Sequence, residues 1–264
     1  VISKSASPFG NDSKMYDSSF GWRFVNPKMH EIYGTDGMGV TAENLVEKHT
    51  ISREDQDAFA YHSQMKATEA QKNGRLAKEI VPVEIPQRKK DPIVFKNDEF
   101  IKPTTTKEIL AKLRPAFKKE GGSVTAGNAS GLNDGAAATI IASEDAVKKY
   151  NLKPLARIVS SAVVGVEPRI MGIGPVEASN KALKKAGLTM EDMDVIELNE
   201  AFASQALACI PNGGSIAIGH PLGVTGARIA YSAALELQEK GKRYALVTMC
   251  VGVGQGYAAI IERV

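Results

Sequence analysis

The chain has 264 residues, of which 43% are hydrophobic and 24% charged, and its formal net charge is +3. This composition is typical of a globular protein with one or two domains, and the small net charge does not favour nucleic-acid binding. Only two cysteines are present, Cys209 and Cys250, so the sequence holds neither a disulfide framework nor a CxxC metal site. No apolar run reaches the ~20 residues of a membrane helix. We therefore expect a cytoplasmic protein without a metal, nucleic-acid or membrane partner. The sequence starts at Val1, and its first residues resemble neither a signal peptide nor a transit peptide.

The first 120 residues do not follow a regular strand and helix rhythm. Residues 1–40 are rich in glycine, proline, serine and aspartate, which predicts an irregular packed region. A helix is expected from Thr41, and a second over Arg53–Lys72, with Ser52 and Asp55 as a capping box and Gly74 after its end. The pattern then predicts a strand over 78–85, a surface loop over 86–106 and a short helix over 107–112.

From residue 121 onward, apolar strands alternate with amphipathic helices. Strands are expected over 136–142, 155–166, 194–198, 215–218, 244–249 and 257–262. Helices are expected over 144–149, 175–186, 200–208 and 226–240. This alternation predicts a layered α/β fold, with boundaries near 120–132 and near 153.

Three loops in the second half each follow a predicted strand and carry polar side chains among small residues. They are Asn199-Glu200-Ala201-Phe202-Ala203, Gly219-His220-Pro221-Leu222-Gly223 and Cys250-Val251-Gly252-Val253-Gly254. Ligand sites of open α/β sheets lie beyond the carboxyl ends of strands, so these loops are expected to converge.

Each residue also has a purely structural interpretation. Cys250 alone would usually be a buried small hydrophobe, His220 a hydrogen-bonded turn residue and Asn199 a cap or turn residue. The glycines after Cys250 favour function, because they allow close approach of backbone N–H groups to a ligand. Cys209 lies on an apolar helix with no glycine-rich turn behind it, so we predict a core role for it.

Several segments together resemble the thiolases, the CoA-dependent acyltransferases. LNEAFA (198–203), NGGSIAIGHPLGVTGAR (212–228) and MCVGVGQGYAAIIERV (249–264) are similar to the three C-terminal signatures of that family. Residues 38–60, 124–138 and 171–178 are similar to further thiolase segments, so the likeness covers nearly the whole chain. YDSSFGWRFVNPKM (16–29) and the form CVGVGQG look most like the 3-oxoadipyl-CoA thiolases of aromatic degradation.

The resemblance implies a role for each matching residue. Cys250 matches the acid–base cysteine, His220 the histidine that donates to the thioester oxygen, Asn199 the asparagine that positions a water in the same oxyanion hole, and Gly252 the N–H donor of a second hole. It implies that a tunnel for coenzyme A (CoA) is lined by Ser130, Met38, Met171, Phe202 and Ala126. A thiol suits acid–base work because its surroundings can tune its pKa toward neutrality.

The sequence departs from the thiolase pattern in three places. The nucleophilic cysteine of the family has no counterpart here, and the context of Cys209 does not match that role. Only Cys209-Ile210-Pro211 join the NEAF helix to the NGG strand, which is very short for that connection. Gly37 stands where many biosynthetic thiolases have a histidine, which disfavours a biosynthetic acetoacetyl-CoA enzyme.

The resemblance implies an α/β protein with the thiolase fold, a layered α/β/α/β/α core, of which this chain holds the C-terminal portion and the loop domain. Residues 1–132 would form the loop domain over CoA and build the oligomer, 133–152 the end of the N-terminal core domain and 153–264 the C-terminal core domain. The expected activity is thiolytic cleavage of a 3-oxoacyl-CoA, with CoA as substrate, no covalently bound cofactor and a homodimer or homotetramer as assembly. The alternative is a catalytically silent CoA-binding or partner subunit that lacks the nucleophile.

Overall fold

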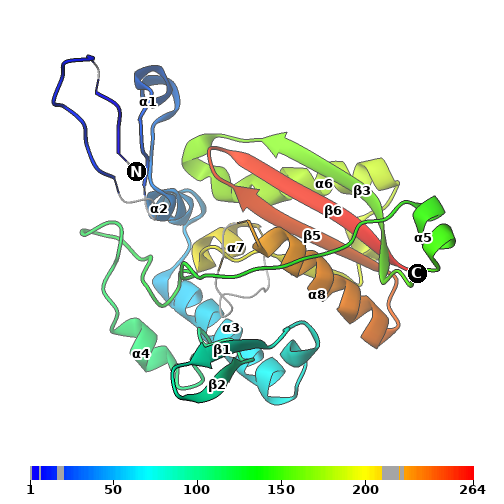
Figure 1. Ribbon diagram of the computed structural model, residues 1–264. Coiled ribbons are helices and arrows are strands. Elements are labelled where there is room, and N and C mark those ends of the chain that lie inside the picture. Colours follow the sequence, from blue (N-terminus) through cyan, green and yellow to red (C-terminus); the bar gives the residue numbers. More distant parts are fainter. Residues whose placement is uncertain (1, 6, 17–20, 210–219, 221–222) are drawn as a thin grey trace.

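The structure is a computed structural model that describes residues 2–5, 7–16, 21–209, 220 and 223–264. Its main element is a mixed β-sheet (Figure 1). Within these residues the sheet has four strands in the order β3 (Ala156–Gly165), β6 (Gln255–Arg263), β5 (Tyr244–Val251) and β4 (Val195–Leu198). β4 and β5 are parallel, whereas β6 runs antiparallel to both of its neighbours. The carboxyl ends of β4 and β5 therefore lie at the same edge of the sheet.

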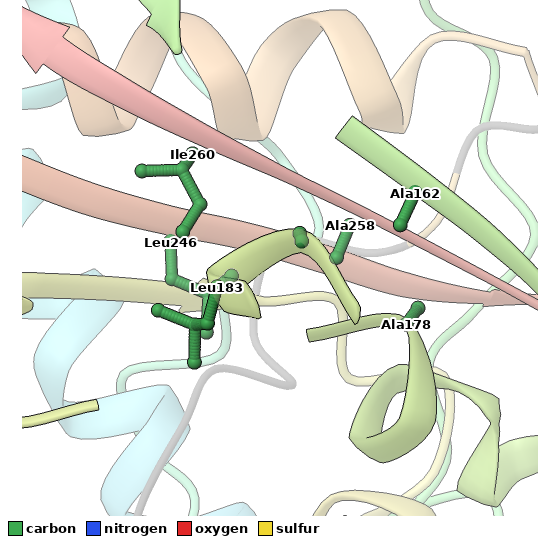
Figure 2. Close-up of a cluster of buried hydrophobic side chains, with 7 residues drawn as sticks. Ala162, Ala178, Leu183, Leu246, Ala258 and Ile260 are labelled. Atoms are coloured by element: carbon green, nitrogen blue, oxygen red, sulfur yellow. The ribbon is translucent and has the colours of Figure 1, made fainter. Parts of the chain in front are cut away.

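A helix covers each face of this sheet. Helix α6 (Gly174–Ala186) packs against β3, β5 and β6, and helix α8 (Thr225–Lys240) packs against β4, β5 and β6 on the opposite face (Figure 1). Figure 2 shows the first interface, where small side chains let the helix approach while larger ones fill the space: Ala162, Ala178, Leu183, Leu246, Ala258 and Ile260. On the other face Ile229, Ala233 and Leu237 of α8 meet Ala245 and Val247 of β5. Strand β5 is thus buried on both faces.

The sequence signals for the helix ends are confirmed. The Ser52 side chain accepts a hydrogen bond from Asp55 N at the start of helix α3 (Arg53–Lys72). Pro175 stands in the first turn of α6, and Gly187 ends that helix in the left-handed conformation. Glycine takes this conformation without strain, so the helix stops where the sequence predicts.

Residues before the sheet form a separate layer of helices with one small hairpin. Its elements are α1 (Pro27–Tyr33), α2 (Met38–His49), α3, the 3₁₀ turn η1 (Leu76–Lys78), β1 (Val83–Gln87), β2 (Lys90–Phe95) and α4 (Lys107–Ala111). After the loop 112–143, α5 (Glu144–Tyr150) lies apart from this layer, near β3 and the C-terminus (Figure 1). Later short elements are η2 (Pro168–Ile173), η3 (Met190–Asp192) and α7 (Ala203–Cys209). Helix α7 contacts α2, α3 and η2, and so joins this layer to the sheet.

Two predictions for the first 106 residues were wrong. The strand expected over 78–85 begins only at Val83, because residues 76–78 form a 3₁₀ turn. The expected surface loop contains β2, which pairs antiparallel with β1. The turn between them places Lys89 at a φ of 59°. A hairpin that uses lysine rather than glycine or asparagine at this conformation carries no recognisable turn signal.

The strand expected over 136–142 is also absent from the structure. Residues 136–142 are irregular, and Ile140 is 89% exposed. The apolar pattern is that of a buried strand, but a strand forms only beside a partner for its backbone groups, and no described strand pairs with this segment. The strand expected over 215–218 lies outside the described residues. Residues 210 and 211 of the short connection at 209–211 also lie outside the described residues, whereas Cys209 is the last residue of α7.

Candidate active site

The loops after β4 and β5 meet because the two strands are parallel neighbours. Leu198 is paired with Thr248, and Asn199 N donates to Thr248 O over 3.0 Å. Cys250 follows two residues after Thr248 on the same strand. The first and third polar loops therefore lie side by side at the carboxyl edge of the sheet, which is where α/β proteins place ligands.

Cys250 is buried in a small apolar cluster at this edge. It packs with Met171 and Ala201, and Phe202 covers the cluster. Burial raises the pKa of the Cys250 thiol to about 12, because the thiolate would lose its hydration. The surroundings of Cys250 in this structure therefore shift its pKa away from neutrality. Cys250 holds its proton at neutral pH.

Asn199 and Glu200 carry buried polar atoms without partners. Asn199 is 4% exposed, and its Nδ2 makes no hydrogen bond within the part of the chain that the structure describes. Glu200 receives one weak bond, from Ser63 Oγ at 3.4 Å, while its Oε1 is unpaired among the described residues. Burial raises the pKa of Glu200 well above its usual value. Unpaired buried donors are costly, so the amide of Asn199 is a candidate ligand contact.

His220 is tied to the site through the segment 128–131. Its backbone N–H donates to Gly131 O over 3.2 Å, and its Nδ1 lies 2.7 Å from Thr225 Oγ1. Burial and then the positive charge of Arg228 lower the pKa of His220, so the ring is neutral at pH 7. If the Thr225 hydroxyl donates to Nδ1, the proton resides on Nε2, which is then a hydrogen-bond donor. Gly219, Pro221 and Leu222 of this loop lie outside the described residues.

Ser130 and its neighbours pair with the loop that follows β4. Ser130 N and Ser130 Oγ both donate to Ala201 O over 2.9 Å. Ala203 N donates to Asn128 O over 2.9 Å, which makes a short bridge between the two segments. Because Ala201 also packs on Cys250, the segment 128–131 links His220 to the thiol.

A buried polar network that sequence reasoning missed fixes this segment. Asn128 Nδ2 donates to Asp57 Oδ1 over 2.9 Å, and Asn128 Oδ1 accepts from Thr125 N over 2.7 Å. Glu43 accepts from Ser123 N at 3.0 Å and Val124 N at 2.9 Å. The only signal in the sequence is a polar residue inside a run of small ones, and its partners lie on helices far away in the chain.

The glycines after Cys250 perform two different tasks. A Cβ on Gly254 would overlap Val166 O, and a Cβ on Gly256 would overlap Gly174 O, so these two allow tight packing of backbone on backbone. Gly252 has open space beside it and lines a cleft. The expectation that these glycines give a ligand access to the backbone therefore applies to Gly252 alone. Val253 between them has a φ of 68°, a strained value for a β-branched residue.

The cleft has a volume of about 340 Å³ and lies beside the Cys250 cluster. Its wall includes Met38, Met171 and Gly252, three of the residues singled out from the sequence. Phe202 packs against the cluster of Met171, Ala201 and Cys250. Ser130 and the exposed Ala126 are not part of this wall. Sequence reasoning missed other residues of the wall, namely Trp22, Arg23, Asp36 and Arg169.

Cys209 lies apart from the cleft on α7. Its Sγ donates to Gly172 O over 3.1 Å, and it packs against the cluster of Phe59, Leu198 and Ala206. Burial raises its pKa to about 12. Among the described residues, no group of three or more His, Cys, Asp or Glu side chains is arranged to hold a metal ion, and no helix is long and apolar enough to cross a membrane.

Comparisons with known proteins agree on one family. The family described as "Thiolase, N-terminal domain" matches residues 11–145, and "Thiolase, C-terminal domain" matches residues 152–263. The beta-ketoadipyl-CoA thiolase of Acinetobacter baylyi is 56% identical over 277 aligned positions, which cover 100% of this chain and 69% of that protein. Since this chain has 264 residues, the relative carries positions that have no counterpart here.

Solved structures show the same relationship. Human mitochondrial 3-ketoacyl-CoA thiolase is 46% identical and superposes with a TM-score of 0.89, over 100% of this chain and 68% of that one. A structure of human mitochondrial 3-ketoacyl-CoA thiolase in complex with CoA is 51% identical, with a TM-score of 0.80 over 86% of this chain and 59% of that one. The expected fold class is therefore confirmed.

Proposed function

Because the chain belongs to the thiolase family, we propose that it carries the CoA-binding and proton-transfer residues of a CoA-dependent acyltransferase. The reaction is thiolytic cleavage of a 3-oxoacyl-CoA by CoA, or the reverse Claisen condensation. Cleavage breaks the bond between C2 and C3, so it yields acetyl-CoA and an acyl-CoA shortened by two carbons. The relatives named for beta-ketoadipyl-CoA support 3-oxoadipyl-CoA as the substrate.

Cys250 is the proton-transfer group in this proposal, and its position beside Asn199 is the observation that carries it. When the C2–C3 bond breaks, the acetyl-CoA carbanion needs a proton at C2. A thiol with a raised pKa still holds that proton at neutral pH and stands ready as a general acid. The thiolate that remains then takes the proton of the incoming CoA thiol. The reverse sequence removes a proton from the methyl group of acetyl-CoA.

Neutral and backbone donors stabilise the thioester oxygen in this scheme. The unpaired Nδ2 of buried Asn199, acting directly or through a water, and the neutral ring of His220 form one oxyanion hole. The N–H of Gly252, which opens on the cleft, serves the second hole. Each such donor contributes roughly 3–4 kcal/mol to transition-state stabilisation in enzymes that transfer acyl groups.

The acyl group itself has to be carried by another cysteine. Cys209 is packed against a helix carbonyl with its pKa near 12, and Cys250 is needed for proton transfer. Neither is a ready thiolate nucleophile. We assign the nucleophile to a residue outside these 264, so the complete reaction belongs to the full-length protein.

CoA would lie across the cleft and the segment 123–131, in contact with Met38, Met171, Phe202, Ser130 and Ala126, as a substrate rather than a covalently bound cofactor. We propose that 1–132 is the loop domain, 133–152 the end of the N-terminal core and 153–264 the C-terminal core. We propose a homodimer or homotetramer in the cytoplasm. Assembly would cover the exposed apolar side chains of the β1–β2 hairpin, which are Val83, Ile93 and Val94.

The test combines calorimetric titration with CoA and a product assay on the full-length protein. With 3-oxoadipyl-CoA and CoA we expect acetyl-CoA and succinyl-CoA in equal amounts, and no products when CoA is omitted. Binding of CoA without products would support the silent CoA-binding subunit instead. Failure to bind CoA would contradict both.

A further inference from the structure

The wall of the cleft beside Cys250 includes charged side chains. Among the described residues these are Arg23, Arg169 and Asp36. The remaining wall is apolar or neutral and includes Trp22 and Met38. A purely aliphatic acyl chain makes no use of charged groups in the wall, whereas an anionic group on the substrate would be attracted to a guanidinium there.

Arg169 is held in place through only part of its guanidinium. Its Nε donates to Asp36 Oδ2 over 3.0 Å, and Asn44 Nδ2 donates to the same oxygen over 2.9 Å. Burial tends to raise the pKa of Asp36, but the hydrogen bonds from Asn44 and Arg169 outweigh it, so Asp36 stays ionised. Asn44 also donates to Arg169 O over 2.8 Å. Nη1 and Nη2 make no hydrogen bond within the described ranges of the chain.

The backbone around Arg169 is fixed relative to the reacting thiol. Val166 N donates to Gly254 O over 2.7 Å, and Pro168 packs against Gly254 in the turn after Cys250. Met171, which follows Arg169 after a kink at Ile170, packs with Cys250. Arg169 lines the same cleft as Met171 and Gly252, whose N–H is assigned to the thioester oxygen.

We propose that Arg169 is a specificity-determining residue whose Nη1 and Nη2 bind the terminal carboxylate of a dicarboxylic acyl-CoA. The paired N–H groups of arginine match a carboxylate in a bidentate geometry. Asp36 and Asn44 hold the side chain in the orientation that presents these two groups. The inference rests on the proposed function and assigns the residue that selects its substrate.

A phosphate of CoA is the other anion that this guanidinium can bind. The diphosphate lies a full pantetheine arm away from the thioester, whereas Arg169 lines the same cleft as Gly252. The position of Arg169 thus favours the acyl end of the substrate. The two sources are separated by CoA alone, which carries the phosphates but no acyl carboxylate.

The test is calorimetric titration of the full-length protein with CoA, hexanoyl-CoA and adipyl-CoA, which lack the 3-oxo group and are not cleaved. The acyl groups are equally long and differ only in the terminal carboxylate. We expect adipyl-CoA to bind about 10- to 100-fold more tightly than hexanoyl-CoA, since a charge-assisted pair is lost in the latter. Arg169→Met should remove this preference and leave the affinities for CoA and hexanoyl-CoA unchanged.

Arg157→Met is the matched control. Arg157 is an exposed arginine paired with Glu262 on the sheet, away from the cleft, so the preference should survive its loss. The proposal is overturned if the preference survives Arg169→Met, or if that variant weakens CoA itself, which would assign Arg169 to a phosphate. A wild-type protein that binds CoA and hexanoyl-CoA but shows no preference overturns this inference alone. Failure to bind CoA at all overturns the proposed function, and this inference with it.

Discussion

The two regions that build the site are stabilised in different ways. The sheet that carries Cys250 has an apolar core between α6 and α8, in which Leu246 is 1% exposed. The segment 123–131 has only a small apolar cluster, in which Val124 and Ala129 pack with Ala42, and it is also fixed by hydrogen bonds to Glu43 and by those of Asn128 to Asp57. Apolar packing supplies most of the stability, whereas the directional bonds fix one loop in one orientation.

This difference separates stability from binding. Damage to the apolar core should lower the free energy of unfolding while the remaining folded molecules keep their site. Damage to the polar network should displace the segment that contacts Ala201 and His220, and so weaken CoA binding as well. Four experiments follow, in order of expected effect.

Leu246→Ala should have the largest effect on stability. It removes a buried side chain of β5 between α6 and the sheet, which costs about 4 kcal/mol of the free energy of unfolding. Urea denaturation measures the loss, and CoA affinity below the transition should stay within about twofold. Leu152→Ala is the control, because that side chain is 39% exposed and should cost under ~1 kcal/mol. A large fall in the CoA affinity of folded Leu246→Ala would contradict the separation of stability from binding.

Gly252 and Gly256, both shortly after Cys250, test the difference between ligand access and backbone packing. Gly256→Ala places a methyl group on Gly174 O, so about 3 kcal/mol of stability should be lost in thermal or urea unfolding. Gly252→Ala has room for the methyl group and should lose less than ~0.5 kcal/mol, yet its turnover should fall because the methyl group enters the cleft beside the N–H of the proposed oxyanion hole. Equal destabilisation by both substitutions would refute the assignment of separate tasks.

Asn128→Ala tests the polar region. The variant removes the hydrogen bonds of Asn128 to Thr125 N and to Asp57 Oδ1, which should cost about 2–3 kcal/mol. Because the segment 128–131 then loses its support, CoA should bind at least about tenfold more weakly in calorimetry. Asn97→Ala changes an exposed asparagine and should alter neither quantity. Loss of stability without loss of affinity would mean that the segment does not contact CoA.

Substitution of Glu197 on β4 should have the smallest effect on the free energy of unfolding, and this effect depends on pH. Burial raises its pKa from 4.5 to about 7, with Arg228 opposing and Glu79 adding to the shift. Between pH 4.5 and about 7 the Glu197 carboxyl is ionised in the unfolded chain but still protonated in the folded one. The free energy of unfolding therefore falls as pH rises through this range, by on the order of 2 kcal/mol. Glu197→Gln should flatten this part of the stability profile. Glu144→Gln, at an exposed site on α5, should leave it unchanged.

Many helices and strands could be predicted from the sequence, because their signals are local. Alternating apolar residues and the caps at Ser52 and Gly187 gave α3, α6 and β3 to within a few residues. The hairpin β1–β2 and the irregular stretch 136–142 could not be predicted, since a strand depends on whether a partner lies beside it.

The candidate site shows the same limit. The adjacency of Asn199 and Cys250 follows from two parallel strands, and the loops around them were visible in the sequence. The raised pKa of Cys250 and the support of Asn128 by Asp57 depend on what the fold packs around each group. Arg169 became a candidate only when the fold placed it in the wall of the cleft beside Cys250.

The central claim is that Cys250 transfers the proton at C2 of acetyl-CoA. Its most direct test is deuterium exchange into the methyl group of acetyl-CoA, followed by NMR in D₂O with the full-length protein. We predict exchange with the wild-type protein and a loss of at least about 100-fold with Cys250→Ala, while CoA binding is retained. Exchange at an unchanged rate in Cys250→Ala would contradict the account, because another group would then be moving the proton.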